Sequence, residues 1–263
     1  MAVDVALAKA LEESEGVLRI YRWARPTLSL GRNQPARDRY DPSAIEALGG
    51  DVVRRPSGGR EVMHDRELTY SVILPLRGLG GLRQSYVTLN QGLVSALRSL
   101  GVNARLAPRT GRPPGPEGGD CFKQAAEGEV EVDGRKLVGS AQARIGHALL
   151  QHGSILLAPP SISLESLYTP PADHAPSPGQ VRMQRPHNGP RPVSFPPSPS
   201  GGITLSEACA GPIGFPRLSA AVEAAMAGCL GGRWAIDSLR DGERSLAESL
   251  LGQYRCSART WAR

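Results

Sequence analysis

The stretch EVEVDGRKLV at residues 129–138 constrains the fold of this chain more than any other segment. Two runs in which apolar and polar residues alternate flank the pair Asp133-Gly134. Such alternation is typical of a strand with one buried face, and an Asp-Gly pair supplies the positive φ angles that a tight two-residue hairpin turn requires. The sequence therefore predicts an antiparallel hairpin here, with Lys136 two residues past its turn.

Other segments rich in β-branched and aromatic residues are each expected to contain a strand. They are VLRIYRWA, TLSLGR, DVVRRP, LTYSVILPL, VNARLAP and LLQHGSILL. Helical patterns occur at the N-terminus, at YDPSAIEALG, at VTLNQGLVSALRSLG and twice near the C-terminus. Because the strands are clustered and do not alternate strictly with helices, the sequence favours an α+β fold with a mixed, largely antiparallel sheet flanked by helices.

The length favours one large domain over residues 1–263. Residues 169–200 differ from the rest, since they hold ten prolines and too few apolar groups to pack. We interpret them as an inserted loop, either a tolerated surface insertion or a lid or docking element. Residues 216–263 are expected to form a C-terminal helical segment.

The composition predicts a soluble protein of a reducing compartment, and we expect it in the cytoplasm. No apolar run approaches the roughly 18 residues that cross a bilayer, and the acidic, helical N-terminus does not resemble a secretory signal. The cysteines show neither metal-ligand spacing nor a disulfide framework, so no metal site is expected. They are Cys121, Cys209, Cys229 and Cys256.

The formal net charge of +6 raises the question of a charged partner. No basic stripe interleaved with aromatic residues is present, so nucleic acid is not expected. Residues 19–60 hold nine arginines against four acids. This segment is either an electropositive surface that steers an acidic protein partner or an ordinary solvated face.

One cysteine and one lysine stand out by context. The loop-like segment RTGRPPGPEGG leads directly into Cys121, which is therefore accessible, whereas cysteines within apolar helical patterns are inert. Of the 31 basic residues only three are lysines, Lys9, Lys123 and Lys136. A lysine retained beside a hairpin turn is a candidate for a specific role.

Two further motifs carry polar residues in strand-like contexts. In RRPSGGREVMHDRELTYSV, residues 54–72, the turn Ser57-Gly58-Gly59 lets the backbone approach a ligand and point its N–H groups at it. His64 follows as either a structural or a site residue. In LLQHGSILL, His152 and Gly153 interrupt an apolar strand, which indicates a site or a buried hydrogen-bond network.

Small side chains follow Lys136 along the hairpin's second strand. Gly139, Ser140 and Ala141 leave space either for another backbone or for a narrow slot that fits a slender aliphatic chain.

Together these motifs resemble the lipoyl/octanoyl transferase and lipoate-protein ligase superfamily, which shares its catalytic fold with biotin protein ligases. The resemblance rests on RRPSGGREVMHDRELTYSV, DCF, DGRKLVGSAQAR and LLQHGSILL in this order, with YRWARPTLSLGRNQ upstream. The residues after His64 and the Cys-Phe pair resemble the cysteine-dependent octanoyltransferases. Glu61 stands where that family has a small residue, which leaves the polarity of the acyl slot open.

The resemblance implies an acyltransferase in which Cys121 is the nucleophile and Lys136 the signature lysine. The substrate-binding residues it implies are Arg55, Ser57, Gly58, Gly59, His64, Gly139, Ser140, Ala141, His152 and Gly153. The donor would be an octanoyl (or lipoyl) acyl carrier protein. The acceptor would be a lysine of a lipoyl-carrier protein, such as the glycine-cleavage carrier protein or a 2-oxoacid dehydrogenase lipoyl domain.

The chemistry expected is a thioester acyl-enzyme on Cys121. A thioester is already activated, so neither ATP nor another cofactor is needed. A cation beside the thiol favours the thiolate and stabilises the oxyanion, and Lys136 can supply it. His64 and His152 would serve either as hydrogen-bond partners that place the reacting groups, which we favour, or as proton acceptors for the incoming amine.

Three other functions stay open. The first is an ATP-dependent lipoate-protein ligase, and the second is an amidotransferase between lipoyl domains. The third is a protein that binds acidic carrier domains through its arginine-rich face without catalysis. The presence of both Cys121 and Lys136 argues against this third function.

Overall fold

The computed structural model describes residues 1–108, 121–122, 125–169, 202–209, 211–255 and 261. The predicted insert at about 169–200 thus lies almost wholly outside the described residues. No helix among the residues described is long and apolar enough to cross a membrane.

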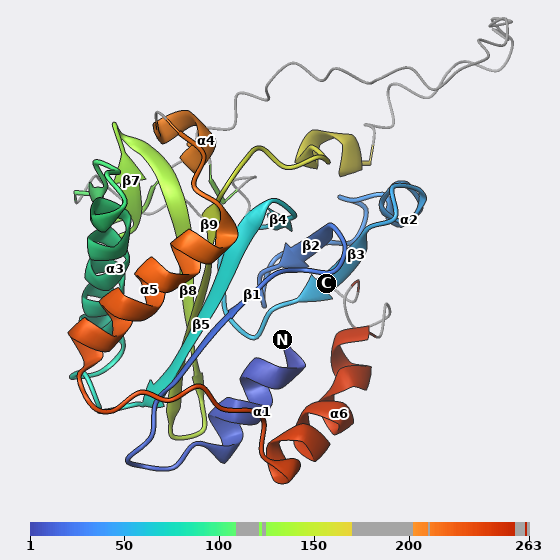
Figure 1. Cartoon of the computed structure of the whole chain (residues 1–263). Coiled ribbons are helices and arrows are strands. Elements are labelled where there is room, and N and C mark those ends of the chain that lie inside the picture. Colours follow the sequence, from blue (N-terminus) through green and yellow to red (C-terminus); the bar gives the residue numbers. More distant parts are fainter. Residues whose placement is uncertain (109–120, 123–124, 170–201, 210, 256–260, 262–263) are drawn as a thin grey trace, which may run out of the picture.

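A six-stranded sheet forms the centre of the fold (Figure 1). All its neighbouring strands pair antiparallel. Its order is β1 (Val17–Tyr21), β5 (Glu67–Pro75), β9 (Ala148–Leu156), β8 (Arg135–Ile145), β7 (Val130–Val132) and β6 (Arg105–Leu106). The expected α+β class with a largely antiparallel sheet is confirmed.

A second, three-stranded sheet lies beside it, which the sequence did not distinguish from the first. Its order is β3 (Asp51–Arg54), β2 (Thr27–Leu30) and β4 (Val62–His64). Strand β2 pairs parallel to β3 and antiparallel to β4. A short helix, α2 (Pro42–Ala47), precedes β3 and begins at Asp41, whose carboxylate accepts the N–H groups of Ser43 and Ala44.

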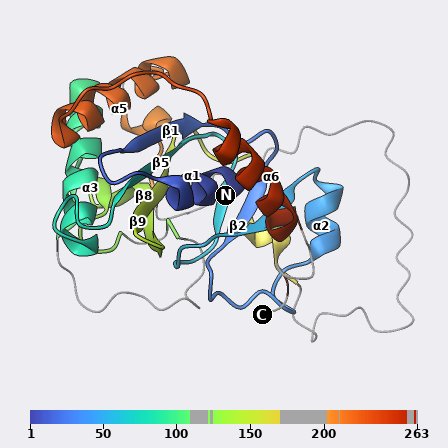
Figure 2. The same cartoon turned by 90° about the horizontal axis from the view of Figure 1, so that it is seen from below.

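Helices cover both faces of the large sheet (Figures 1 and 2). Helices α3 (Leu82–Ser99) and α5 (Phe215–Leu230) pack together on one face. Helix α1 (Ala2–Ala10) packs on the other face and against α6 (Asp241–Arg255). Two short helices, η1 (Leu164–Leu167) and α4 (Leu205–Ala208), complete the described fold, and α5 and α6 lie in the region where C-terminal helices were expected.

Strand alternation decides which residues face the core and which face the site. On β5, Leu68, Tyr70 and Val72 join the core formed with α3 and α5. Because successive side chains point to opposite faces, Thr69 and Ser71 face the other side, beside His152 and Ser154 of the paired strand. Thr69, Ser71, His152 and Ser154 therefore lie on the α1 face, where the candidate site lies, whereas Gln151 contacts Asn90 of α3 on the other face.

The predicted hairpin is confirmed. Asp133 and Gly134 have φ angles of 50° and 77° and join β7 to β8. The pairing of the two strands contains an irregularity between Val130 and Glu131, which moves the residues before it out of simple register. The bulge lies next to the pair formed by Glu131 and Lys136.

Candidate active site

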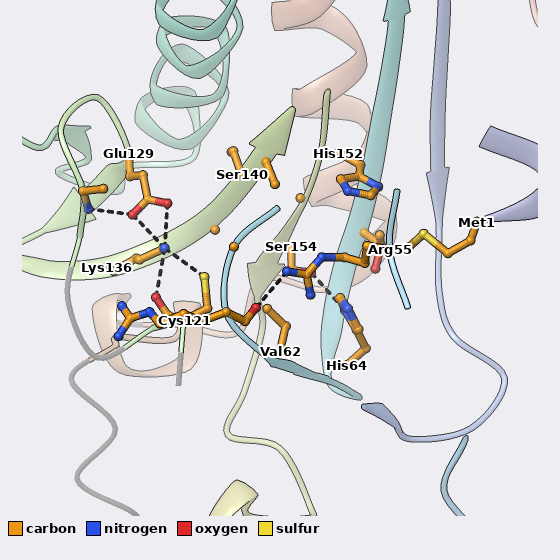
Figure 3. Close-up of a pocket in the computed structure, with 17 residues that line it drawn as sticks. Met1, Arg55, Val62, His64, Cys121, Glu129, Lys136, Ser140, His152 and Ser154 are labelled. Atoms are coloured by element: carbon orange, nitrogen blue, oxygen red, sulfur yellow. Dashed lines mark hydrogen bonds and ion pairs between the residues drawn. The ribbon is translucent and has the colours of Figure 1, made fainter. Parts of the chain in front are cut away.

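A cavity of about 290 Å³ opens between the α1 face of the large sheet and strand β4 of the small sheet (Figure 3). Ten of the twelve predicted site residues line it. They are Cys121, Lys136, Arg55, Gly59, His64, Gly139, Ser140, Ala141, His152 and Gly153. The other two, Ser57 and Gly58, lie behind the lining and contact it through hydrogen bonds.

Charged and reactive groups gather at one end of the cavity, which we call the nucleophile end and define by Cys121, Glu129 and Lys136. The Nζ atom of Lys136 lies 3.4 Å from the Sγ atom of Cys121 and 3.0 Å from its carbonyl oxygen. It also donates to the Glu129 carboxylate at 2.7 Å. All three ammonium hydrogens of Lys136 thus have acceptors, and one of them is directed at the sulfur.

Lys136 is almost fully buried, at 2% exposure. Burial on its own lowers the pKa of Lys136, but the neighbouring Cys121 and Glu129 outweigh burial, and the pKa is raised above the ordinary lysine value. Lys136 is therefore an ammonium group at neutral pH. It suits the stabilisation of negative charge on sulfur or oxygen and does not act as a base.

A backbone hydrogen bond holds Cys121 against the segment that contains Glu61. Its N–H donates to the carbonyl oxygen of Glu61 at 3.2 Å. The next residue, Phe122, is buried, and its ring centre lies 5.4 Å from Nζ of Lys136. A Cβ atom on Gly139 would lie 3.1 Å from this ring. The small residue at position 139 therefore leaves room for the Phe122 side chain as well as for a ligand.

Glycine is more strictly required at position 153 than at position 139. A Cβ atom there would lie 2.3 Å from the carbonyl oxygen of Gly139 and 2.8 Å from the ring of Tyr70. Gly153 thus permits close packing of β8, β9 and β5. Gly139, Ser140 and Ala141 line the cavity, and its use as a slot for an aliphatic chain stays a prediction.

The opposite end of the cavity, which we call the histidine end, contains Arg55, His64 and His152 (Figure 3). His152 Nε2 lies 2.5 Å from the hydroxyl of Ser57. Burial lowers the pKa of His152 to about 3, although Asp4 opposes this. His152 is neutral, and within the described structure its Nδ1 atom has no hydrogen-bond partner.

His64 is fixed on both ring nitrogens. Its Nδ1 lies 2.6 Å from the carboxylate of Glu67 and therefore carries hydrogen, while Nε2 lies 2.6 Å from the hydroxyl of Ser29. The ring also stacks on Trp23 with a centroid distance of 4.6 Å. A histidine held in this way is suited to shaping the cavity.

Arg55 stabilises the loop that carries Ser57, Gly58 and Gly59. Its guanidinium donates to the carbonyl oxygens of Ser29, Gly58 and Arg60 at 2.8–3.1 Å. This loop packs closely on the turn after β2, because a Cβ atom on Gly31 would lie 1.9 Å from the carbonyl oxygen of Gly59. Gly59 lines the cavity and has a φ angle of 96°, which favours glycine, and substrate binding by this turn and by Arg55 stays a prediction.

The Glu61 side chain points away from the cavity, which it does not line. The buried carboxylate accepts hydrogen bonds from Gln34, from Arg39 at 3.2 Å and from the hydroxyl of Tyr168 at 2.7 Å. The departure from the family pattern at this position therefore adds no charge to the cavity lining.

The arginine-rich segment 19–60 is only partly a surface. Four of its arginines are exposed, namely Arg22, Arg25, Arg32 and Arg37, whereas Arg55 and Arg60 are buried in the cavity wall. Among the residues described, no group of three or more His, Cys, Asp or Glu side chains could hold a metal ion.

Glu129 is the site residue that the sequence did not reveal. A hairpin with a two-residue turn places Glu131 opposite Lys136, and this pairing is present. The carboxylate of Glu131 nevertheless pairs with Arg105 at 2.8 Å, and it is Glu129 that contacts the ammonium at 2.7 Å. The segment EVEV contains both Glu129 and Glu131, and its alternating pattern does not indicate which of the two contacts Lys136.

Relatives of this chain are known. The family model described as "Lipoyl protein ligase A/B catalytic domain" matches residues 1–185. Octanoyltransferase LipM of Kyrpidia tusciae is 36% identical over 263 residues, which covers 97% of this chain and 90% of that protein. Octanoyltransferase LipM of Carboxydothermus hydrogenoformans is 43% identical over 162 residues, and this match covers 60% of each chain.

Solved structures share the fold. A lipoate-protein ligase A bound with ATP superposes with a TM-score of 0.73 at 19% identity, covering 99% of this chain and 92% of that chain. A bipartite lipoate protein ligase from Thermoplasma acidophilum, studied with its E2 lipoyl domain, gives 0.72 at 20%, covering 99% and 89%. The predicted superfamily is confirmed by the family and relative matches, and the chain belongs to the lipoyl protein ligase A/B catalytic domain family.

Proposed function

We propose that this protein is an octanoyltransferase of lipoate biosynthesis that carries the octanoyl group as a thioester on Cys121. The relatives named octanoyltransferase support the enzyme class. The observation that carries the mechanism is the 3.4 Å separation between the Cys121 sulfur and the Lys136 ammonium at the edge of a cavity. A lipoyl group, transferred by the same route, is the alternative substrate.

In the first step the Cys121 thiolate attacks the carbonyl carbon of an octanoyl thioester on acyl carrier protein. A bond forms between Sγ and this carbon, the bond to the carrier's sulfur breaks, and the carrier leaves as a thiolate that takes a proton from water. Lys136 stabilises the attacking thiolate by its charge. The ammonium hydrogen that points at Sγ then becomes available to the oxyanion of the tetrahedral intermediate.

In the second step the neutral ε-amine of an acceptor lysine attacks the acyl-enzyme. A C–N bond forms, the bond to Sγ breaks, the amine loses a proton to solvent and the Cys121 thiolate is restored. No phosphate chemistry is involved, because a thioester is higher in energy than the amide product. The small residues Gly139 and Ala141 beside Cys121 leave a slot in which the aliphatic chain would lie.

The donor and acceptor are proteins in this proposal. The acceptor would be a lipoyl-carrier protein, such as the glycine-cleavage carrier protein or a 2-oxoacid dehydrogenase lipoyl domain. Acyl carrier protein as the donor fits a positively charged chain, and exposed arginines such as Arg32 and Arg37 would contribute to its docking.

The test is intact-mass measurement after mixing the protein with octanoyl acyl carrier protein in the absence of ATP. The wild type should gain one octanoyl group, and Cys121→Ser should gain none. Cys209→Ser and Cys229→Ser are matched controls that should still be acylated, because burial raises the pKa of both thiols and neither lies in the cavity.

Modification of a lipoyl domain by Cys121→Ser that depends on ATP and free octanoate or lipoate would overturn the proposal in favour of a ligase. Transfer from an octanoylated lipoyl domain, but not from acyl carrier protein, would instead identify an amidotransferase. Binding of carrier domains without any acyl adduct would indicate a non-catalytic protein.

A further inference from the structure

Glu129 is the only carboxylic acid among the described residues that line the cavity. Its carboxylate contacts Nζ of Lys136 at 2.7 Å and accepts the N–H of Ala126 at 2.7 Å. The turn just before β7 holds this residue in place, since its own N–H donates to the carbonyl oxygen of Ala126. Glu129 is 5% exposed, so water screens its charge little.

Two ionisable groups accept from the Lys136 ammonium, namely the sulfur of Cys121 and the carboxylate of Glu129 in the turn before β7. Only one of these two groups keeps the same charge throughout the proposed reaction. Once the sulfur of Cys121 carries an acyl group it is no longer charged, whereas the carboxylate of Glu129 is unchanged. In the acyl-enzyme Glu129 is therefore the one remaining anion in direct contact with the ammonium within the described structure.

We infer that Glu129 is a positioning residue that keeps Lys136 charged and directed at the thioester in the acyl-enzyme, and thereby serves the transfer to the acceptor amine. This inference rests on the proposed function. A buried ammonium without an anion loses its proton, and a neutral amine stabilises an oxyanion far less well. The requirement for Glu129 is thus greater in the second half-reaction than in the first, where the thiolate itself is a partner of Lys136.

The inference has a consequence for pH. Other titratable groups near this pair are Tyr70 of β5 and Tyr86 of α3, both of which have pKa values raised chiefly by burial and are neutral below pH 10. Arg55 acts on Cys121 from across the cavity. Removal of Glu129 should therefore lower the pKa of Lys136 in the acyl-enzyme and move the alkaline limb of the acceptor step to lower pH.

The experiment compares the two half-reactions in Glu129→Gln. Stopped-flow or quenched-flow mass measurement gives the rate of acylation by octanoyl acyl carrier protein and the rate at which a lipoyl domain removes the group. We expect acylation within about tenfold of wild type and acceptor transfer slowed by about 10²-fold, the loss typical of a missing oxyanion donor. The acyl-enzyme then accumulates, and Glu129→Asp restores part of the second rate.

Glu131→Gln is the matched control. This acid lies on the same strand two residues away, and its carboxylate pairs with Arg105 and not with Lys136. Both half-reactions should be unchanged in it. Equal slowing of both steps in Glu129→Gln, or no slowing of either, would overturn the inference, whereas absence of any adduct in the wild type would overturn the proposed function itself.

A double-mutant cycle keeps the test decisive if Glu129→Gln folds poorly, since removal of one member of a buried ion pair is strongly destabilising. Lys136→Met removes the other member, and Lys136→Met/Glu129→Gln leaves no buried charge from the pair. If Glu129 acts through Lys136, its loss adds nothing to the acceptor-step defect of Lys136→Met. A further loss of tenfold or more would mean that Glu129 acts on the substrate directly.

Discussion

The two ends of the cavity contrast in how their ionisable groups are held. At the nucleophile end a thiol, an ammonium and a carboxylate contact one another out of water, and the pKa of Lys136 is raised. At the histidine end burial lowers the pKa of His152 to about 3, and His64 is held on both ring nitrogens. Histidine is usually the first candidate for acid-base catalysis near pH 7. The residues that we propose to be reactive nevertheless lie at the nucleophile end, which is defined without a histidine.

The contrast follows from where the residues lie in the sheets. His152 projects from β9, between β5 and β8 at the centre of the large sheet, where water is excluded and Asp4 and Arg55 act on it with opposite sign. Lys136 lies near the start of β8, where a bulge and an adjoining turn admit Glu129 and the Cys121 loop. Both ends thus hold ionisable groups in contact, since His64 meets the Glu67 carboxylate, and at the nucleophile end an ammonium lies beside a thiol.

The largest expected effect comes from removal of the ammonium. Lys136→Met retains the length of the side chain but not its charge, and acyl transfer should fall about 10²–10³-fold, as expected for loss of an oxyanion donor. In His152→Asn, at the histidine end, the rate of acyl transfer should fall no more than about tenfold, which is the effect of losing a neutral hydrogen bond. Single-turnover rates with octanoyl acyl carrier protein measure both, and equal losses would contradict the division between the two ends.

Gly153→Ala should have the next largest effect, and on stability. Its Cβ atom would lie 2.3 Å from the carbonyl oxygen of Gly139, a backbone atom that cannot move without separating β8 from β9. Overpacking of this kind costs about 1–3 kcal/mol. Gly228→Ala in α5 is the control, because nothing lies within 4 Å of its Cβ position and helix propensity should raise stability slightly. Urea unfolding compares them, and an unchanged midpoint for Gly153→Ala would show that the strands tolerate the methyl group.

Much of this arrangement could be predicted from the sequence, for identifiable reasons. Asp133-Gly134 determined the hairpin because its φ angles are local. The loop predicted before Cys121 lies outside the described residues, and Cys121 is partly exposed, as are Cys209 and Cys229. The motif order identified the family. Ten of the twelve predicted residues line the cavity, and six of them lie on the paired strands β8 and β9.

The remainder depended on contacts that no local pattern encodes. The choice of Glu129 over Glu131 rests on side-chain contacts, since Glu131 pairs with Arg105 and Glu129 with Lys136. The close approach of Gly59 to Gly31, which is distant in sequence, is a tertiary contact, and whether the Gly-Gly turn points its N–H groups at a ligand stays a prediction. The separation of β2, β3 and β4 into a sheet of their own likewise required tertiary pairing.

A smaller effect is expected in the pH dependence of stability. Histidine has an ordinary pKa of 6.5, while that of folded His152 is about 3 because of burial. Between these values the unfolded chain binds a proton that the folded chain does not, so His152 makes stability fall as pH falls through this window. His152→Asn should flatten the decline of unfolding free energy between about pH 6.5 and pH 3. Denaturant titrations at a series of pH values measure this slope, and an unchanged slope would place a charged His152 in the folded protein.

The smallest effect on transfer is expected at Glu61, which lies between Arg55 and His64 in sequence but does not line the cavity. Glu61→Ala removes hydrogen bonds to Arg39 and Tyr168 and should lower stability by about 1–3 kcal/mol. The carbonyl oxygen that accepts the N–H of Cys121 belongs to the backbone and is retained. Acylation rates with acyl groups of several lengths should therefore keep their wild-type order. A changed preference for chain length would mean that the carboxylate faces the acyl slot during turnover, and the polar lining would then extend from the histidine end to the wall behind Cys121.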